Sequence, residues 1–471
     1  MTDRSESAVS WSTDGITLDY RSPLELGLRL GDYVAVHVDG DHEPRLAQLL
    51  TQRSVEYDGR VWIEGTGRLL ARGSAGDPFD RLAMGAAGSE LVRGLLGHGP
   101  TGLELGTLQR VPEVPAVIDA KGFNRHTFLC GQSGSGKTYA LGGLLEQLIL
   151  HTRLPLLVLD PNGDHVGLGR TRQGVDPDLA ASYATAAADV RVLHADPQQG
   201  ADPLRIRLKD LGVVGIASLL QLDPIADRQE YNGLVHALRA TTDERFPTVE
   251  AAINAFRTSG DAILDQIRMR TENLGIDRMS AWAGLTGASV RTVGDIWQQE
   301  QPRALVADSS GFEERRERIV VTVAVLELLW AARHHRRPML LVVDEAHDVC
   351  PADPEDPLQR LAVELFTRIA GEGRKYGIHL LLASQRPDKL PDNVLTQCDN
   401  LLLMRVNSAG DRASLADRFA FVPPELIELS GTFGLGETLR AGRIAPHPQL
   451  ARTGSRLTPE GGADIPTDWA G

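Results

Sequence analysis

The chain has 471 residues, of which 42% are hydrophobic and 24% charged. This composition is typical of a soluble globular protein, and the length predicts two to four domains. The net charge of −14 argues against a protein that coats nucleic acid nonspecifically, although it leaves room for a local basic channel.

The opening residues and the cysteines narrow the class of protein further. The first residues, MTDRSESAVS, contain no apolar segment, so we expect no signal peptide. No apolar run approaches the ~18 to 20 residues that cross a membrane, and we therefore expect a cytoplasmic protein without a membrane partner. Cys130, Cys350 and Cys398 are widely spaced and odd in number, which favours buried thiols over a disulfide framework or a zinc site.

Residues 1–112 show the short alternating runs of a β-rich domain. Residues 32–40 place valine at every second position, at Val34, Val36 and Val38. Residues 54–65 carry an Asp-Gly hairpin signal between two alternating runs. We predict a small β-barrel or sandwich here, and we take the barrel as the N-terminal domain. Two prolines at 112 and 115 mark a linker between this domain and the next.

Residues 113–450 are predicted to form an α/β domain with a doubly wound parallel sheet. Apolar runs that end in polar residues recur along it, as a sheet covered on both faces requires. Residues 357–377 place apolar side chains at helical spacing. Residues 166–300 have amphipathic pieces but few strand signals, so we predict a helical insertion, and residues 451–471 are predicted to be a tail. The apolar runs lie at 126–130, 154–165, 303–311, 338–348, 377–387 and 400–406.

The sequence FLCGQSGSGKTYA, residues 128–140, matches the phosphate-binding loop G-x-x-x-x-G-K-[ST] at every fixed position. It leads from an apolar run to a helical pattern, where backbone N–H groups favour an anion. Lys137 is placed to reach the β- and γ-phosphates, and the Thr138 hydroxyl to hold Mg²⁺. A glycine-rich turn without a ligand is the alternative. The residues expected to bind the nucleotide here are Gly131, Ser133, Gly134, Ser135, Gly136, Lys137 and Thr138.

Hydrolysis needs further groups, and two strand ends supply candidates. Asp344 and Glu345 end the run MLLVVDEAHD, where the first carboxylate can bind Mg²⁺ through water and the second can polarise the attacking water. Gln385 follows another apolar run and could sense the γ-phosphate or orient water. An ordinary acidic turn and an ordinary polar strand end are the alternatives.

A basic turn follows the long helical pattern. The sequence GEGRKYG, residues 371–377, sets Arg374 and Lys375 between glycines. Such a tip has no evident use in packing its own core, so a phosphate partner is attractive. A solvated turn is an equal alternative.

Several segments together resemble the HerA family of ring ATPases. They are FNRHTFLCGQSGSGKT, LVLDPNGDH, LLVVDEAHDV, GEGRKYGIHLLLASQRPDKLPDNVLTQCDN and GETLRAGRIAPHP, in the family's order and behind a similar β-rich domain. The resemblance covers residues 20–450 and implies a RecA-like P-loop ATPase core with ATP and Mg²⁺ as cofactors. It also implies a homohexameric ring that moves double-stranded DNA, usually beside a nuclease partner.

The same resemblance suggests roles for single residues. Arg374 resembles an arginine finger that reaches the ATP of a neighbouring subunit, and Arg125 resembles a second basic contact. Asp160 and Asp164 lie where the family's strand ends near the nucleotide. In this region the family often has a histidine and a glutamate where Asn162 and Asp164 stand here, so we assign the region no catalytic role.

The sequence leaves more than one function open. The first is a hexameric motor that translocates double-stranded DNA with a nuclease, in end processing or phage defence. The second is an ATPase scaffold that assembles or gates a defence effector, which the acidic balance slightly favours. A secretion or conjugation ATPase is a weaker third, because no apolar run is long enough to cross a membrane.

Overall fold

The computed structural model describes residues 7–37, 44–70, 76–97, 101–196, 198–200, 202–239, 248–283 and 290–461. Val38 and residues 462–471 of the predicted tail lie outside these ranges. The chain forms two compact units, each assembled from separate stretches of sequence. Unit 1 comprises Met1–Gly122, Cys130–Ala140 and Asp399–Ser455, and unit 2 comprises Phe123–Leu129, Leu141–Cys398 and Arg456–Gly471.

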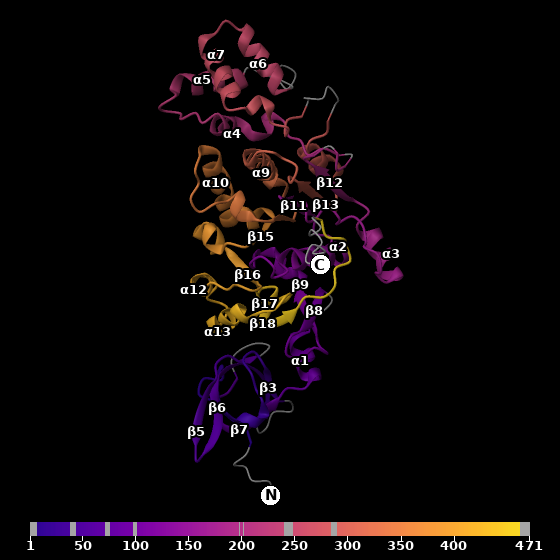
Figure 1. The fold of residues 1–471 in the computed structure, drawn as a ribbon, viewed down its shortest axis with the longest axis vertical. Helices are drawn as coiled ribbons and strands as arrows, with labels where there is room; N and C mark the ends of the chain where they lie inside the picture. The colour runs from indigo at the N-terminus through magenta and orange to yellow at the C-terminus, as the bar shows by residue number, and fades with distance from the viewer. Residues whose placement is uncertain are drawn as a thin grey trace, which may run out of the picture. The chain divides into compact units, whose positions relative to one another are not determined.

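Unit 1 contains a closed β-barrel, drawn in indigo in Figure 1. Its strands follow the order β2-β1-β7-β3-β4-β6, and β6 pairs with β2 to close the ring. β5 forms a hairpin with β6, and the predicted turn at Asp58 and Gly59 has φ values of 50° and 72°. The predicted barrel is thus confirmed. Its strands are β1 (Val9–Ser12), β2 (Thr17–Pro23), β3 (Tyr33–Val36), β4 (Arg45–Leu49), β5 (Arg53–Tyr57), β6 (Arg60–Leu70) and β7 (Phe79–Ala86).

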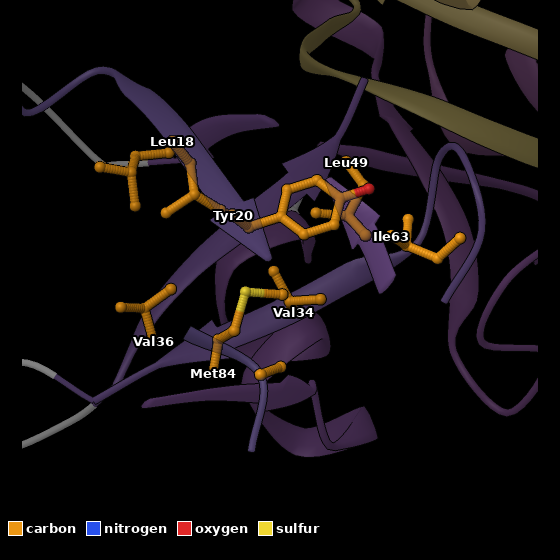
Figure 2. Packing of buried hydrophobic residues seen from close by; sticks show 10 residues of the cluster. Leu18, Tyr20, Val34, Val36, Leu49, Ile63 and Met84 are labelled. Atoms are coloured by element: carbon orange, nitrogen blue, oxygen red, sulfur yellow. The ribbon is translucent and has the colours of Figure 1, made fainter. Parts of the chain in front are cut away.

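Apolar side chains from several strands fill the barrel (Figure 2). Tyr20 lies among them, and its hydroxyl donates to the backbone carbonyl of Thr51 at 3.0 Å. β3 is buried on both faces, because Tyr33 packs in a second cluster with α1 (Ser89–Leu96). The valine alternation therefore accounts for only one of its two buried faces. The labelled core residues are Leu18, Tyr20, Val34, Val36, Leu49, Ile63 and Met84.

Unit 1 also holds antiparallel strands in the order β16-β17-β18-β8-β9. The run at 400–406 was predicted as part of a parallel sheet, but β16 pairs with β17 in antiparallel direction. A buried apolar run looks the same in both cases, since burial and not direction sets its composition. The elements are β8 (Gly102–Leu108), β9 (Pro115–Asp119), β16 (Cys398–Leu403), β17 (Glu437–Gly442), β18 (Ala445–Arg452), α12 (Ala409–Arg418) and α13 (Pro424–Glu428).

Unit 2 is built on a sheet with the strand order β12-β13-β11-β14-β15-β10. All neighbouring pairs in the series β12-β13-β11-β14-β15 are parallel. β11, β13, β14 and β15 are buried at every position, as the continuous apolar runs predict. β12 is a partly exposed edge strand within the predicted helical insertion. The strands are β10 (His126–Cys130), β11 (Leu156–Asp160), β12 (Val190–His194), β13 (Ala304–Asp308), β14 (Met339–Val343) and β15 (Ile378–Ser384).

Two predicted helices have their apolar positions buried, namely α2 (Lys137–His151) and α10 (Pro357–Glu372). Asp356 caps α10 by accepting the N–H of Gln359 at 2.8 Å. In the insertion, α7 packs against both α5 and α6 (Figure 1). The remaining helices of unit 2 are α3 (Pro177–Ala186), α4 (Gly212–Leu219), α5 (Arg228–Arg239), α6 (Val249–Thr258), α7 (Ala262–Asn273), α8 (Val293–Asp295), α9 (Arg315–Ala331) and α11 (Asp392–Leu395).

Residues 456–461, which we call the C-terminal strap, cross α2 within unit 2. The carboxylate of Glu146 on α2 is buried and accepts from Arg456 Nε at 3.2 Å. It also accepts the backbone N–H groups of Leu457 at 2.7 Å and Thr458 at 3.0 Å. Part of the predicted tail is therefore fixed to the helix that comes after the phosphate-binding loop.

Two expectations from composition can be compared with the structure. The cysteines are free and buried, as predicted. Across the described ranges, every helix is too short or too polar to span a bilayer.

Candidate active site

The phosphate-binding loop of unit 1 has the backbone that its glycines predict. β10 ends at Cys130 and α2 begins at Lys137, so the loop leads from a strand to a helix N-terminus. Gly134 and Gly136 have φ values of 71° and 91°, in the region that favours glycine. Such a backbone allows successive N–H groups to point at one anion.

Arg405, which the sequence analysis did not single out, holds the outer part of this loop. The N–H of Gln132 donates to the carbonyl of Arg405 at 3.0 Å, and Arg405 Nη2 donates to the carbonyl of Gly134 at 3.1 Å. Arg405 follows a strand end like the other candidates, but its partners lie far away in the sequence. No local pattern signals such a contact.

The inner part of the loop is buried and close-packed. A Cβ on Gly131 would lie 2.8 Å from the Cβ of Met404, so only glycine fits there. Lys137 is 4% exposed. The Ser135 hydroxyl is buried and has no hydrogen-bond partner among the residues that the structure describes. A phosphate oxygen would satisfy that hydroxyl, because buried polar atoms in native proteins are nearly always paired.

In unit 2, polar side chains follow the carboxyl ends of neighbouring strands. Asp160 ends β11 and lies in register with Asp308 at the end of β13. His194 ends β12, and its Nδ1 lies 2.8 Å from Asp308 Oδ2. Asp344 follows β14. The parallel sheet thus gathers at one edge side chains that are distant in the sequence, where open α/β sheets bind their ligands.

His165, which the sequence analysis missed, lies between two of these carboxylates. Its Nε2 is 3.5 Å from Asp344 Oδ2, and both side chains are fully buried. Asp160 accepts the backbone N–H of His165 at 2.7 Å. Burial on its own would lower the pKa of His165, but Asp344 and Asp160 outweigh it, so the pKa lies above its usual value. A histidine in the turn after a strand is too common a pattern to signal this role.

Glu345 and Gln385, predicted from different strand ends, are in contact. Gln385 Nε2 donates to Glu345 Oε1 at 2.6 Å, and His347 Nδ1 lies 3.4 Å from Glu345 Oε2. Glu345 is buried and has φ 43° and ψ 48°, the left-handed region that non-glycine residues seldom adopt. Strained backbone of this kind clusters at functional sites, where the surrounding structure enforces it.

The two arginines suggested by the family resemblance influence the same two buried histidines of unit 2, His126 and His379. Arg374 is exposed in the turn Gly373–Tyr376, and Arg125 precedes β10. Burial lowers the pKa of His126 to about 3 and of His379 to about 4, and both guanidiniums contribute to each shift. The segments that carry the two arginines are in contact, because His126 Nε2 lies 3.0 Å from the carbonyl oxygen of Ala370.

The structure therefore places the candidate residues in separate groups. The group in unit 1 contains Gly131, Ser133, Gly134, Ser135, Gly136, Lys137 and Thr138. The group in unit 2 contains Arg125, Asp344, Glu345, Arg374 and Gln385.

The oxygen donors among the candidate residues are of the kind that Mg²⁺ binds. Within the described ranges, no group of three or more His, Cys, Asp and Glu side chains could hold a metal ion. Mg²⁺ is usually bound by one or two protein oxygens together with waters and substrate phosphates. The Thr138 hydroxyl and the Asp344 carboxylate are oxygen donors of that kind.

Comparison with known proteins identifies the relatives of this chain. Residues 103–327 match the family described as "Helicase HerA, central domain". The chain is 23% identical over 408 residues to the DNA double-strand break repair helicase HerA of Pyrococcus furiosus, covering 75% of this chain and 70% of that protein. It is 22% identical to a probable helicase of Methanocaldococcus jannaschii, covering 82% of this chain and 73% of that protein.

Among solved structures, VirB4 of Thermoanaerobacter pseudethanolicus has the same fold. The TM-score is 0.52 at 15% sequence identity, over 76% of this chain and 97% of that chain. The predicted fold class is confirmed, namely a doubly wound α/β P-loop ATPase fold with an N-terminal barrel and a helical insertion. Together with the matched HerA sequences, the loop and the strand-end carboxylates support one conclusion: the chain is a P-loop ATPase that is similar to the HerA helicases.

Proposed function

We propose that this ATPase translocates double-stranded DNA as a homohexameric ring, beside a nuclease or another effector protein. The observation that carries the proposal is the match to a HerA helicase over 75% of the chain. The names of such relatives describe helicases of DNA double-strand break repair. DNA end processing and phage defence are the two settings that we consider for this activity.

In this proposal the loop at 131–138 binds the phosphates of ATP. The burial of Lys137 and the positive φ values of Gly134 and Gly136 support it, because they suit a cradle of N–H groups around an anion. When bound, Mg²⁺ would be held by Thr138 and, through water, by Asp344, and it would neutralise charge on the phosphates.

Glu345 is proposed to polarise the attacking water. The hydrogen bond from Gln385 at 2.6 Å fixes one carboxylate oxygen and thereby orients the other. Burial strengthens the interaction of this carboxylate with a water proton, because the surroundings screen charge less than bulk water does. Gln385 is then a residue that orients Glu345 and senses the nucleotide.

Arg374 is proposed to reach the ATP of a neighbouring copy of the chain, with Arg125 beside it as a second basic contact. Arg374 is exposed at the end of a long helix, which supports a role outside its own core. A guanidinium supplied in this way stabilises the charge that develops on the transferred phosphoryl group.

The second candidate is an ATPase scaffold that assembles and regulates a defence effector without processive translocation. The net charge of −14 favours it, since an acidic protein gains little from contact with the DNA backbone at long range.

One experiment separates the two candidates. The rate of ATP hydrolysis is measured with linear duplex DNA at low and near-physiological salt, with and without the effector protein. A translocase must contact the backbone, so DNA should accelerate hydrolysis, and the acceleration should weaken steeply as salt rises. A scaffold should respond to the effector, with DNA making little difference. Absence of any DNA effect with the effector bound, across that salt range, would contradict translocation.

A further inference from the structure

His126 is the first residue of β10, and both of its ring nitrogens are engaged inside unit 2. The backbone N–H of Leu380 on β15 donates to Nδ1 at 2.9 Å. Nε2 lies 3.0 Å from the carbonyl oxygen of Ala370 on α10. A backbone N–H can only donate and a carbonyl can only accept, so the ring is neutral with its proton on Nε2. The ring is 0% exposed.

The bond to Ala370 fixes the end of the helix that carries Arg374. α10 ends at Glu372, so Ala370 is among the last four residues, whose carbonyls have no intrahelical partner. His126 supplies a donor to one of them. The turn Gly373–Tyr376 follows directly, and a Cβ on Gly373 would lie 2.9 Å from the carbonyl oxygen of Ile378. The base of the Arg374 turn is therefore closely packed and held from one side by His126.

His126 also follows Arg125 directly in the chain, so the bonds of its ring anchor the backbone next to Arg125. Burial, the adjacent His379 ring, Arg374 and Arg125 all lower the pKa of His126, which reaches about 3. The ring therefore stays neutral throughout the physiological range and adds no positive charge between two guanidiniums. Lysine or arginine at position 126 would add a positive charge that repels the two guanidiniums. An apolar residue there would remove the partner that His126 gives to the N–H of Leu380 and to the carbonyl of Ala370.

We propose that His126 is a positioning residue that holds Arg374 and Arg125 in place for their action on the nucleotide of a neighbouring subunit. This inference rests on the proposed role of Arg374 between subunits. His126 could instead hold the phosphate-binding loop of its own chain, because β10 leads directly into that loop. The test must therefore distinguish action through Arg374 from action through the loop.

Mixing two variants that each have reduced activity makes that distinction. A complete interface needs Glu345 from one subunit and Arg374, held by His126, from the next. Rings of His126→Phe and Glu345→Gln subunits contain such an interface, so hydrolysis should return. Rings of His126→Phe and Arg374→Ala subunits contain none, so their hydrolysis should not exceed that of the parent rings. Return of activity in the second mixture would place His126 on the loop side and overturn the proposal.

The reference for both mixtures is a ring of Arg374→Ala and Glu345→Gln subunits, with co-assembly shown for every pair. If this reference regains activity and the first mixture does not, the positioning role is wrong. If the reference itself stays inactive, the role of Arg374 between subunits fails. Hydrogen exchange of residues 371–377 then decides for His126 separately. Faster exchange in His126→Phe supports the positioning role, and unchanged exchange contradicts it.

Two further variants guard against a simple folding defect. His126→Phe alone should lower kcat by about tenfold or more while the KM for ATP changes less than about threefold. His126→Gln keeps an N–H donor close to the Nε2 position and should recover most of that loss. His379→Phe is the matched control, since His379 is also buried but its Nδ1 has no hydrogen-bond partner within the described residues. Equal losses of kcat in His126→Phe and His126→Gln would refute the importance of the Ala370 bond.

Discussion

Gly142 and Gly143 are adjacent in α2, and they differ in what an added methyl group would meet. A Cβ on Gly142 would lie 2.2 Å from Cζ of Arg456 in the C-terminal strap, whereas a Cβ on Gly143 would meet nothing within 4 Å. Alanine in place of glycine inside a helix gains about 1 kcal/mol. We therefore predict that Gly142→Ala and Gly143→Ala change the free energy of unfolding in opposite directions.

The size of the Gly142→Ala effect follows from what Arg456 loses. Its side chain is 1% exposed, and its Nε donates to the buried carboxylate of Glu146 at 3.2 Å. A Cβ this close must displace the guanidinium end of Arg456, which has little room to move because it is buried, and breaking a buried ion pair costs about 3 to 5 kcal/mol. After subtraction of the helix gain, Gly142→Ala should be destabilised by about 2 to 4 kcal/mol. Gly143→Ala should be stabilised by up to about 1 kcal/mol.

Denaturant unfolding followed by circular dichroism measures both variants against the unmodified protein. Repeating the measurement in an Arg456→Ala variant sharpens the test, because that variant lacks the side chain that a Cβ at position 142 would meet. In that background Gly142→Ala should become stabilising, and the two substitutions should be strongly non-additive. Equal stabilities of Gly142→Ala and Gly143→Ala, or additive effects of Gly142→Ala and Arg456→Ala, would refute the reasoning.

The remaining predictions concern the nucleotide and pH. Lys137→Ala should abolish ATP binding, whereas Glu345→Gln should still bind ATP while hydrolysis falls by about 10² or more. Calorimetric titration measures ATP binding, and phosphate release measures hydrolysis. Unchanged turnover in Glu345→Gln would show that Glu345 has no catalytic role. The pKa values of His126 and His379, about 3 and about 4, lie below the usual 6.5, chiefly through burial, so the unfolded chain binds protons first as pH falls. Stability should therefore decline below pH 6.5 towards pH 4, less steeply in His126→Phe, and unfolding midpoints that rise over that range would contradict it.

The strands and the loop could be predicted because each depends on a local pattern. Central strands of a covered sheet have no exposed face, so β11, β13, β14 and β15 appear as continuous apolar runs. β12 escaped prediction because it is an edge strand whose side chains are mostly half-exposed. The loop was identified because its glycines and lysine stand at fixed spacing.

Partners that are distant in the sequence could not be predicted. The contact between His165 and Asp344 and the bonds of His126 to Leu380 and Ala370 join separate elements without any periodic signal. Glu345 and Gln385 were each expected at a strand end, but only the structure gives their contact. Single polar residues in turns are too frequent for a pattern to select the functional ones.

The register at the sheet edge has a consequence for how chains of this kind diverge. His194 and Asp308 remain in contact at 2.8 Å although residues 195–307 separate them in the sequence. The helices α5, α6 and α7 lie within that segment, and α7 packs against both α5 and α6. Because the pairing of β11, β12 and β13 sets the spacing of the polar side chains, we expect substitution, shortening or replacement of these helices to leave that spacing unchanged. We expect related chains to differ most in these helices, and lineages to acquire new specificities there while the chemistry stays constant.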